Sequence, residues 1–298
     1  MNNHAVVRNC SLARWTAAAV LSSVALCAPA VAQTKVEKRF PVDVRPVIQV
    51  RNDNGKVTVR SWQKSEVQVI ATLASAKVEM DAQKMGNRID ITSHRLEDNV
   101  TAAEQRVDYE ITVPEETELQ VRIDSGMILV ERVFGDLVFD TVAADVELQE
   151  VAGYIVVKTI SGSVLCVRCA GGRLEIFSVS GNVRLIQPVN SAVLVNTTTS
   201  NILFEGDFLR TGSYRLKNYS GLIEVVLNDS DSLDISANAV QGKIESDPGL
   251  KLTPRTHGGR PSAPARGAAR SFVGMLNDGA ARVDLSTFNG TIRIRRRE

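Results

Sequence analysis

A unit of one turn and one strand recurs about every nine residues along most of this chain. Each turn is marked by a glycine or by a residue standing in its place, and turns of like sequence follow one another every 18 to 21 residues. One kind of turn carries a Ser-Gly pair, as at Gly162 and Gly181, and the other kind falls midway between these, as at Gly153 and Gly171. Self-similarity at a fixed period indicates a repeat architecture.

The hydrophobic pattern within each repeat alternates with a period of two. The second and fourth residues after a turn are apolar, as in Leu137 and Phe139, whereas the first and third are often polar, as in Asp145 and Glu147. Since successive side chains of a strand point to opposite faces, the apolar set faces a shared interior. We therefore expect an all-β fold: a parallel β-solenoid, similar to a β-helix, with two short strands in each rung of 18–21 residues.

Small polar residues recur at one corner of successive rungs. Stacking at the strand spacing of about 4.8 Å would align them as a polar ladder along one edge. Such residues are ordinary turn formers, so we favour a role in capping backbone groups at the corner; an ice-like or glycan-binding row is the alternative. The corner ladder consists of Thr141, Thr159, Ser178, Thr197, Asn218 and Thr287.

These patterns divide the chain into five parts. A signal peptide covers residues 1–32, and a β-rich N-terminal capping region with some antiparallel pairing covers 33–118. Rungs occupy 119–246 and resume over 271–298, which ends in a charged cap. The segment between them, 247–270, is rich in Pro, Gly and Arg and is typical of a flexible insertion.

The N-terminus has the three parts of a secretory signal. Arg8 and Arg14 precede an apolar run at 15–28, and small residues at 30–32 form a cleavage site. The run is shorter than the roughly 20 residues that span a bilayer, so we expect no transmembrane segment after cleavage. We predict an exported protein that is periplasmic, extracellular or on the cell surface. The remaining charges nearly cancel, so nucleic acid is not an expected partner.

Two cysteines follow the signal peptide, Cys166 and Cys169, and export permits a disulfide between them. Their spacing is that of a redox Cys-x-x-Cys motif, but no helix start is expected nearby to stabilise a thiolate. Aligned on the repeat, both fall at positions that other rungs fill with apolar residues. We favour buried thiols acting as small hydrophobic side chains, with a local disulfide as the alternative.

Side chains that would support catalysis or metal binding are scarce. His94 and His257 lie far from the cysteines, and neither has the spacing of a zinc site or of a Ser-His-Asp triad. Glycosidic cleavage typically needs two carboxylates across a groove. The outward acids instead interleave with cations and apolar residues, as on a solvated face; they are Asp145, Glu147, Glu175, Glu224 and Glu245. We expect no enzyme activity, no cofactor and no metal.

Apolar residues also occupy several outward positions on the second sheet that are elsewhere polar. One interpretation is a contact surface for a partner or for another copy of the chain; the other is that the N-terminal region or the insertion folds over it. This predicted contact surface consists of Val138, Tyr154, Val156, Ala192 and Leu194.

Three further features carry a family resemblance: the run 54–62, the Tyr-x-Ile-x-Val-Pro bridge at 109–114, and the Ser-Gly rungs at Gly162 and Gly181. Together they resemble the bacterial putative-adhesin family of β-strand-repeat proteins, a family of unknown function. The resemblance covers nearly all of the chain after the signal peptide. It implies an exported β-solenoid and supplies no catalytic residues.

The sequence therefore predicts a non-enzymatic envelope scaffold, adhesion or binding module. We expect its partner to be an envelope glycan or protein, or another copy of the chain. Two alternatives stay open: a carbohydrate-active β-helix enzyme, either a lyase or a hydrolase, and a self-assembling structural element.

Overall fold

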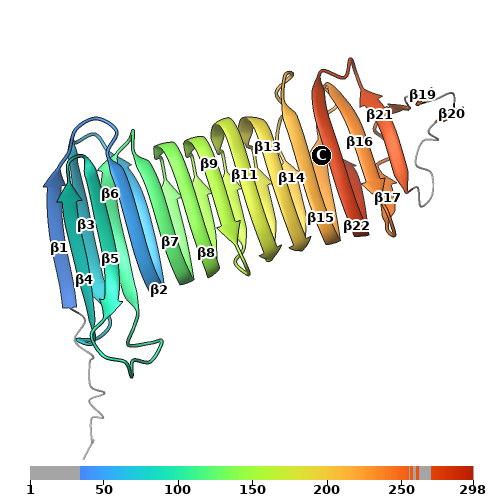
Figure 1. Ribbon diagram of the computed structural model, residues 1–298. Coiled ribbons are helices and arrows are strands. Elements are labelled where there is room, and N and C mark those ends of the chain that lie inside the picture. The colour runs from blue at the N-terminus through green and yellow to red at the C-terminus, as the bar shows by residue number, and fades with distance from the viewer. Residues whose placement is uncertain (1–33, 255, 258–259, 262–269, 298) are drawn as a thin grey trace, which may run out of the picture. The chain divides into compact units, whose positions relative to one another are not determined.

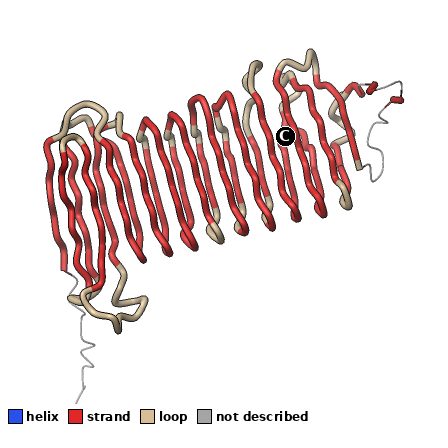
Figure 2. The backbone as a smooth tube through the Cα atoms, in the orientation of Figure 1, coloured by secondary structure: helices blue, strands red, loops and turns tan. Residues whose placement is uncertain are grey.

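The computed structural model describes residues 34–254, 256–257, 260–261 and 270–297. Strands and loops make up this part of the chain, as Figure 2 shows. The strands are β1 (Thr34–Pro41), β2 (Val47–Trp62), β3 (Glu66–Leu73), β4 (Val78–Met85), β5 (Arg88–Arg95), β6 (Val107–Pro114), β7 (Glu118–Glu131), β8 (Phe134–Gln149), β9 (Ala152–Thr159), β10 (Val164–Val167), β11 (Ala170–Ser180), β12 (Val183–Ile186), β13 (Val189–Thr199), β14 (Ile202–Glu205), β15 (Ser213–Leu227), β16 (Leu233–Ala239), β17 (Lys243–Ser246), β18 (Thr253–Pro254), β19 (Thr256–His257), β20 (Arg260–Pro261), β21 (Ser271–Leu276) and β22 (Ala281–Arg296). The predicted all-β character is confirmed.

Most of these strands pair in parallel with the strands of the neighbouring repeats (Figure 1). One series of pairings runs from β2 through β7, β8, β9, β11 and β13 to β15. A second series runs from β8 through β10, β12 and β14 to β15. Equivalent residues of successive repeats therefore lie side by side in rows along the molecule.

The prediction of an open β-solenoid with two short strands per rung is wrong. Strands β8 and β15 take part in both series, so β8, β9, β11, β13, β15, β14, β12 and β10 form a closed ring of eight parallel strands. Further strands extend this closed, barrel-like arrangement at both ends. The ring closes because β8 and β15 each remain one continuous strand through the corner, at residues 143–144 and 220–221. The repeat pattern predicted that each strand would end there.

The interior is filled by the residues that the alternation placed there. Leu137, Phe139, Val146 and Leu148 are all buried, and the equivalent residues of the following repeats are buried as well. Each such side chain contributes about 1.5–3 kcal/mol through removal from water. The rows of inward side chains form one continuous core along the described strands.

Antiparallel pairs are found at the N-terminal end, as the sequence predicted for residues 33–118. Strand β4 pairs with β5, and β3 lies between β1 and β6 in antiparallel order. Strand β2 pairs in parallel with β5, β6 and β7, and it joins this end to the closed ring through β7.

The C-terminal end departs from sequence order. Strand β22 lies between β15 on one side and β16 and β17 on the other, and it pairs with all three in parallel. The repeat that follows β15 in the sequence is thereby separated from it by the last strand of the chain. Strand β21 closes this end by pairing antiparallel with β16.

Cys166 and Cys169 are joined by a disulfide between the end of β10 and the start of β11. Both residues are fully buried, so their predicted place in the core is confirmed. The favoured interpretation as free thiols is corrected. Their Cα atoms lie 5.9 Å apart across the corner, which is within the range that a disulfide spans.

The proposed signal peptide, residues 1–32, lies outside the described residues, as does much of the segment 247–270. The start of that segment packs against the fold, because Leu250 is buried and β18 pairs with β21.

Candidate contact edge

The corner ladder forms a continuous row, but it lies inside the molecule. Strand pairing aligns Thr141 with Thr159, then with Ser178, Thr197, Asn218 and Thr287 in successive strands. Each of these residues is only 1–6% exposed. They are therefore not a surface row for ice or glycan.

Hydrogen bonds of the ladder run to the backbone at the corner. The Oγ1 atom of Thr159 accepts a hydrogen bond of 2.9 Å from the backbone N–H of Gly162. The Ser178 hydroxyl donates to the carbonyl oxygen of Ser180 at 2.9 Å, and the Asn218 amide donates to the carbonyl oxygen of Ser200 at 3.2 Å. These are contacts of a corner cap.

The residue after each ladder position points outward and forms an exposed row, which we call the apolar edge. The exposed fractions are 45% for Val142, 52% for Ile160, 49% for Val179, 54% for Tyr219 and 47% for Val240. The rings of Tyr219 and Phe288 stack with centroids 4.8 Å apart and planes at 10°. In order along the strands, the apolar edge consists of Val142, Ile160, Val179, Thr198, Tyr219, Phe288 and Val240.

Sequence reasoning missed this row because its members lie inside the turns. Ile160 stands between Thr159 and Ser161, and Val179 stands between two serines, so each looks like part of a polar turn. The available signal was an apolar residue that recurs next to the ladder position in turn after turn. Because successive side chains of a strand point to opposite faces, the residue next to a buried ladder residue points into solvent.

A groove of about 450 Å³ runs beside the first half of the apolar edge. Ladder residues form its floor, and Val142, Ile160, Val179 and Thr198 form one wall. The other wall consists of Arg122, Asp140, Lys158, Phe177 and Asn196.

The second of these walls, which we call the outer wall, is polar except for Phe177 and carries both signs of charge. Arg122, Asp140 and Lys158 lie in one row across β7, β8 and β9, and all three are exposed. None of the three forms an ion pair with another residue that the structure describes. A smaller hollow of about 180 Å³ adjoins the groove and shares Arg122 and Asp140 with it.

The predicted contact surface lies on the face beside this groove, but its members are not continuous. Val138 and Val156 are neighbours in one row, and Leu194 follows in the same row after Glu175. Tyr154 is 39% exposed, whereas Val156 is only 7% exposed.

The second row of that surface is interrupted in the same way. Tyr154 and Ala192 lie on either side of Arg173, which forms an ion pair with Glu175. This ion pair separates the two apolar parts of the face. The functional role of the face stays a prediction.

Residues 47–295 match the model of the protein family described as Toastrack DUF4097. The chain belongs to the Toastrack DUF4097 family. This agrees with the expected membership of a family of unknown function, but the β-solenoid repeat attached to that expectation is not supported by the closed ring of strands. No match to this Toastrack chain was found among curated proteins.

Several solved structures match this chain at low sequence identity and with TM-scores below 0.5. A putative adhesin from Bacteroides fragilis is 8% identical, with a TM-score of 0.42, over 89% of this chain and 98% of that one. A putative adhesin from Parabacteroides merdae is 11% identical, with a TM-score of 0.41, over 87% and 95% of the two chains. A putative lipid-binding protein from Parabacteroides distasonis is 10% identical, with a TM-score of 0.41, over 89% and 97%.

Two outward acidic residues of the Toastrack chain flank an arginine. Glu224 and Glu245 lie on either side of Arg293, whose Nε is 3.1 Å from a carboxylate oxygen of Glu245. Among the residues lining the groove, Asp140 is the one carboxylate. The pair of acids that glycosidic cleavage uses is not assembled in the groove.

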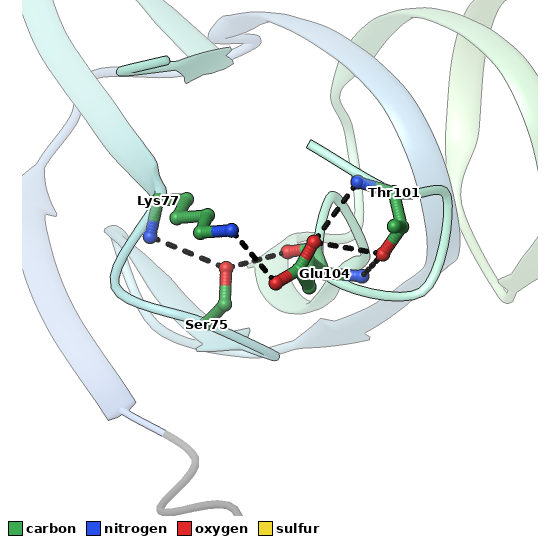
Figure 3. Close-up of polar contacts among 4 residues, drawn as sticks. All are labelled: Ser75, Lys77, Thr101 and Glu104. Atoms are coloured by element: carbon green, nitrogen blue, oxygen red, sulfur yellow. Dashed lines mark hydrogen bonds and ion pairs between the residues drawn. The ribbon is translucent and has the colours of Figure 1, made fainter. Parts of the chain in front are cut away.

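A polar cluster at the N-terminal end fixes the loop between β5 and β6 (Figure 3). The Glu104 carboxylate accepts hydrogen bonds from the backbone N–H of Thr101 at 3.0 Å, from the Lys77 ammonium at 2.9 Å and from the Thr101 hydroxyl at 2.8 Å. These contacts, the Thr101 backbone first, lower the pKa of Glu104 to about 2. The Ser75 hydroxyl also donates to the carbonyl oxygen of Glu104. Because Glu104 binds its own loop and its neighbour, we assign it a structural role.

Neither a metal-binding cluster nor a membrane-spanning helix is found in the described part of the chain. No group of three or more His, Cys, Asp or Glu side chains there could hold a metal ion. The same residues include no helix of the length and apolar character needed to cross a membrane.

Proposed function

We propose that this protein is an exported, non-catalytic contact module of the bacterial envelope, acting as a scaffold, adhesion or binding module. It works by binding another macromolecule along the apolar edge. The observation that carries the proposal is the exposed row from Val142 to Val240 beside the groove.

The energetic argument rests on the exposure of these side chains. Scattered apolar residues are ordinary on protein surfaces, but a contiguous apolar row rimmed by polar residues is typical of an interaction site. The apolar edge, whose central residue is Thr198, has small polar residues such as Ser161 and Ser180 on one side. Along its first half, the largely polar wall of the groove lies on the other side. Removing apolar surface from water contributes about 25 cal/mol per Å² before the entropic and desolvation costs of association are subtracted. Aromatic residues such as Tyr219 are enriched among the residues that dominate interfaces.

Export is supported by the signal-like residues at the N-terminus and by the disulfide. Disulfides persist in oxidising compartments and are rare in the cytosol. The buried Cys166–Cys169 pair is therefore suited to a protein that folds after export. The groove contains one carboxylate, Asp140, and so does not supply the two acids that glycosidic cleavage typically uses.

The proposal is tested by photo-crosslinking in living cells. A photoreactive amino acid is placed at Val179 on the apolar edge or at Val189, which is 52% exposed at the opposite corner. We expect irradiation to yield a specific crosslinked species from position 179 and little or none from position 189. The species should be found in the envelope or periplasmic fraction.

The two positions form a matched pair, because both are exposed valines with similar exposed fractions, and they lie at opposite corners of successive repeats. Efficient crosslinking from position 189 with none from position 179 would refute the edge as the contact surface. Recovery of the folded protein solely in the cytosol would refute export.

A further inference from the structure

We infer that the apolar edge binds a second copy of this chain, in an antiparallel two-fold pairing centred on Thr198. This deepens the proposed function, on which it rests, by naming the partner of the same surface. The argument comes from the spacing of the edge, the position of the groove and the charges beside it.

The spacing between side chains along the apolar edge matches the spacing between strands in a second copy of the chain. Its side chains recur at the strand spacing of about 4.8 Å. An α-helix presents successive turns about 5.4 Å apart, so its side chains fall out of register with the edge within a few turns. A second copy repeats at the same interval along the whole edge, which allows every position to find a partner.

The two halves of the edge have complementary shapes. The groove flanks the half from Val142 to Thr198, whereas the stacked rings of Tyr219 and Phe288 lie beyond it on the other half. A single chain cannot place its own aromatic half in its own groove. In an antiparallel pair, the aromatic half of each copy crosses the groove of the other.

The pairing matches apolar residues over the full length of the edge. With Thr198 of both copies at the two-fold axis, Val179 faces Tyr219 of the second copy, Ile160 faces its Phe288, and Val142 faces its Val240. Each of these contacts occurs twice, once from each copy, as two-fold symmetry requires.

Charges of the outer wall agree with the same arrangement. The wall residues beside Val142, Ile160 and Val179 are Asp140, Lys158 and Phe177, and those of the other half are Lys217, Ser286 and Asn238. In the antiparallel pair, Lys217 faces the Phe177 ring, Lys158 faces Ser286, and Asp140 faces Asn238. No like charges meet, and the Lys217 ammonium is placed to interact with an aromatic face.

The geometry is tested by disulfide trapping of the full chain. The native pair at 166 and 169 is buried and disulfide-bonded, and Cys10 and Cys27 lie in the predicted signal peptide. An introduced cysteine is therefore the free thiol of the exported protein. Under mild oxidation, we expect Thr198→Cys to form a covalent dimer readily. Val142→Cys alone should stay monomeric, because its counterpart in the second copy is Val240.

A mixture of Val142→Cys and Val240→Cys proteins should crosslink. Self-crosslinking of Val142→Cys as readily as Thr198→Cys would instead show a parallel pair and overturn the inference. Failure of Thr198→Cys to form a dimer would overturn it as well.

Sedimentation equilibrium then measures the association itself. We expect the mass to rise from one chain to two chains with concentration, and Tyr219→Thr to raise the dissociation constant at least about tenfold. Threonine is a suitable replacement because Thr198 already occupies this row. The control Val189→Thr should leave the constant unchanged.

The outcomes separate the two proposals. A protein that stays monomeric at every concentration overturns the second copy as partner. If position 179 still crosslinks to another macromolecule in cells, the proposed contact function survives with a different partner. Loss of crosslinking in cells overturns both.

Discussion

Replacing Gly171 by alanine should lower the free energy of unfolding by about 3 kcal/mol or more, a large part of the stability of an ordinary domain. Gly171 has a φ of +116°, a conformation that L side chains rarely adopt. A Cβ there would lie 2.5 Å from the carbonyl oxygen and 2.6 Å from the nitrogen of Gly153. Since both atoms belong to the backbone of the neighbouring strand, neither can move aside without disturbing the pairing of β9 with β11.

The next residue supplies the matched control. An added Cβ at Gly172 meets no atom within 4 Å, and its φ lies outside the strained range. Gly172→Ala should be neutral or stabilise the protein by up to about 1 kcal/mol, because alanine restricts the unfolded chain. Urea unfolding followed by circular dichroism measures both variants. Equal losses in the free energy of unfolding for the two variants would contradict the close approach of Gly171 to the backbone of Gly153.

Removing the last strand should have a still larger effect. A chain that stops after Ala280 loses β22, which pairs with β15 over Ser213–Leu227 and also with β16 and β17. The truncation exposes the edge of β15 and the core residues beside it, which is the kind of edge that promotes aggregation. We expect the truncated protein to be insoluble or to lack cooperative thermal unfolding.

A chain that stops after Arg296 is the control, because it retains all of β22. It should remain soluble and unfold within a few degrees of the full chain. A soluble, β-rich and cooperatively folded protein from the shorter truncation would show that β16 and β17 can take the place of β22 on β15.

The core of this fold could be predicted from local sequence, because period-two alternation decides which side chains are buried. Leu137 and Phe139 illustrate this: both were assigned to the interior and both are fully buried. The corner ladder was also aligned correctly, since a constant repeat length brings Thr141 beside Thr159.

Other features depend on information that the repeat does not carry. Closure of the ring requires β8 and β15 to stay extended through their corners, which a pattern of turn residues does not specify. The insertion of β22 between β15 and β16 is a long-range choice among similar strands, and no local propensity distinguishes it from pairing in sequence order.

The candidate site shows the same division. The sequence predicted a contact surface on the face around Leu194, because apolar residues occupy outward positions there that are polar in other repeats. The structure shows that an ion pair interrupts that face, whereas the more exposed apolar row lies at the corner. Ile160 and Val179 are hard to recognise from the sequence, because each stands between residues that are typical of turns.

The most direct test of the apolar edge as the contact surface is thiol labelling inside cells. Val179→Cys and Leu194→Cys are compared in the otherwise unchanged protein, using a membrane-permeant maleimide. We predict that the cysteine at 179 is protected in cells and becomes reactive in the purified, diluted protein, while the cysteine at 194 reacts in both. Protection at 194 with free reaction at 179 would contradict the account and identify the face, not the edge, as the surface that is covered.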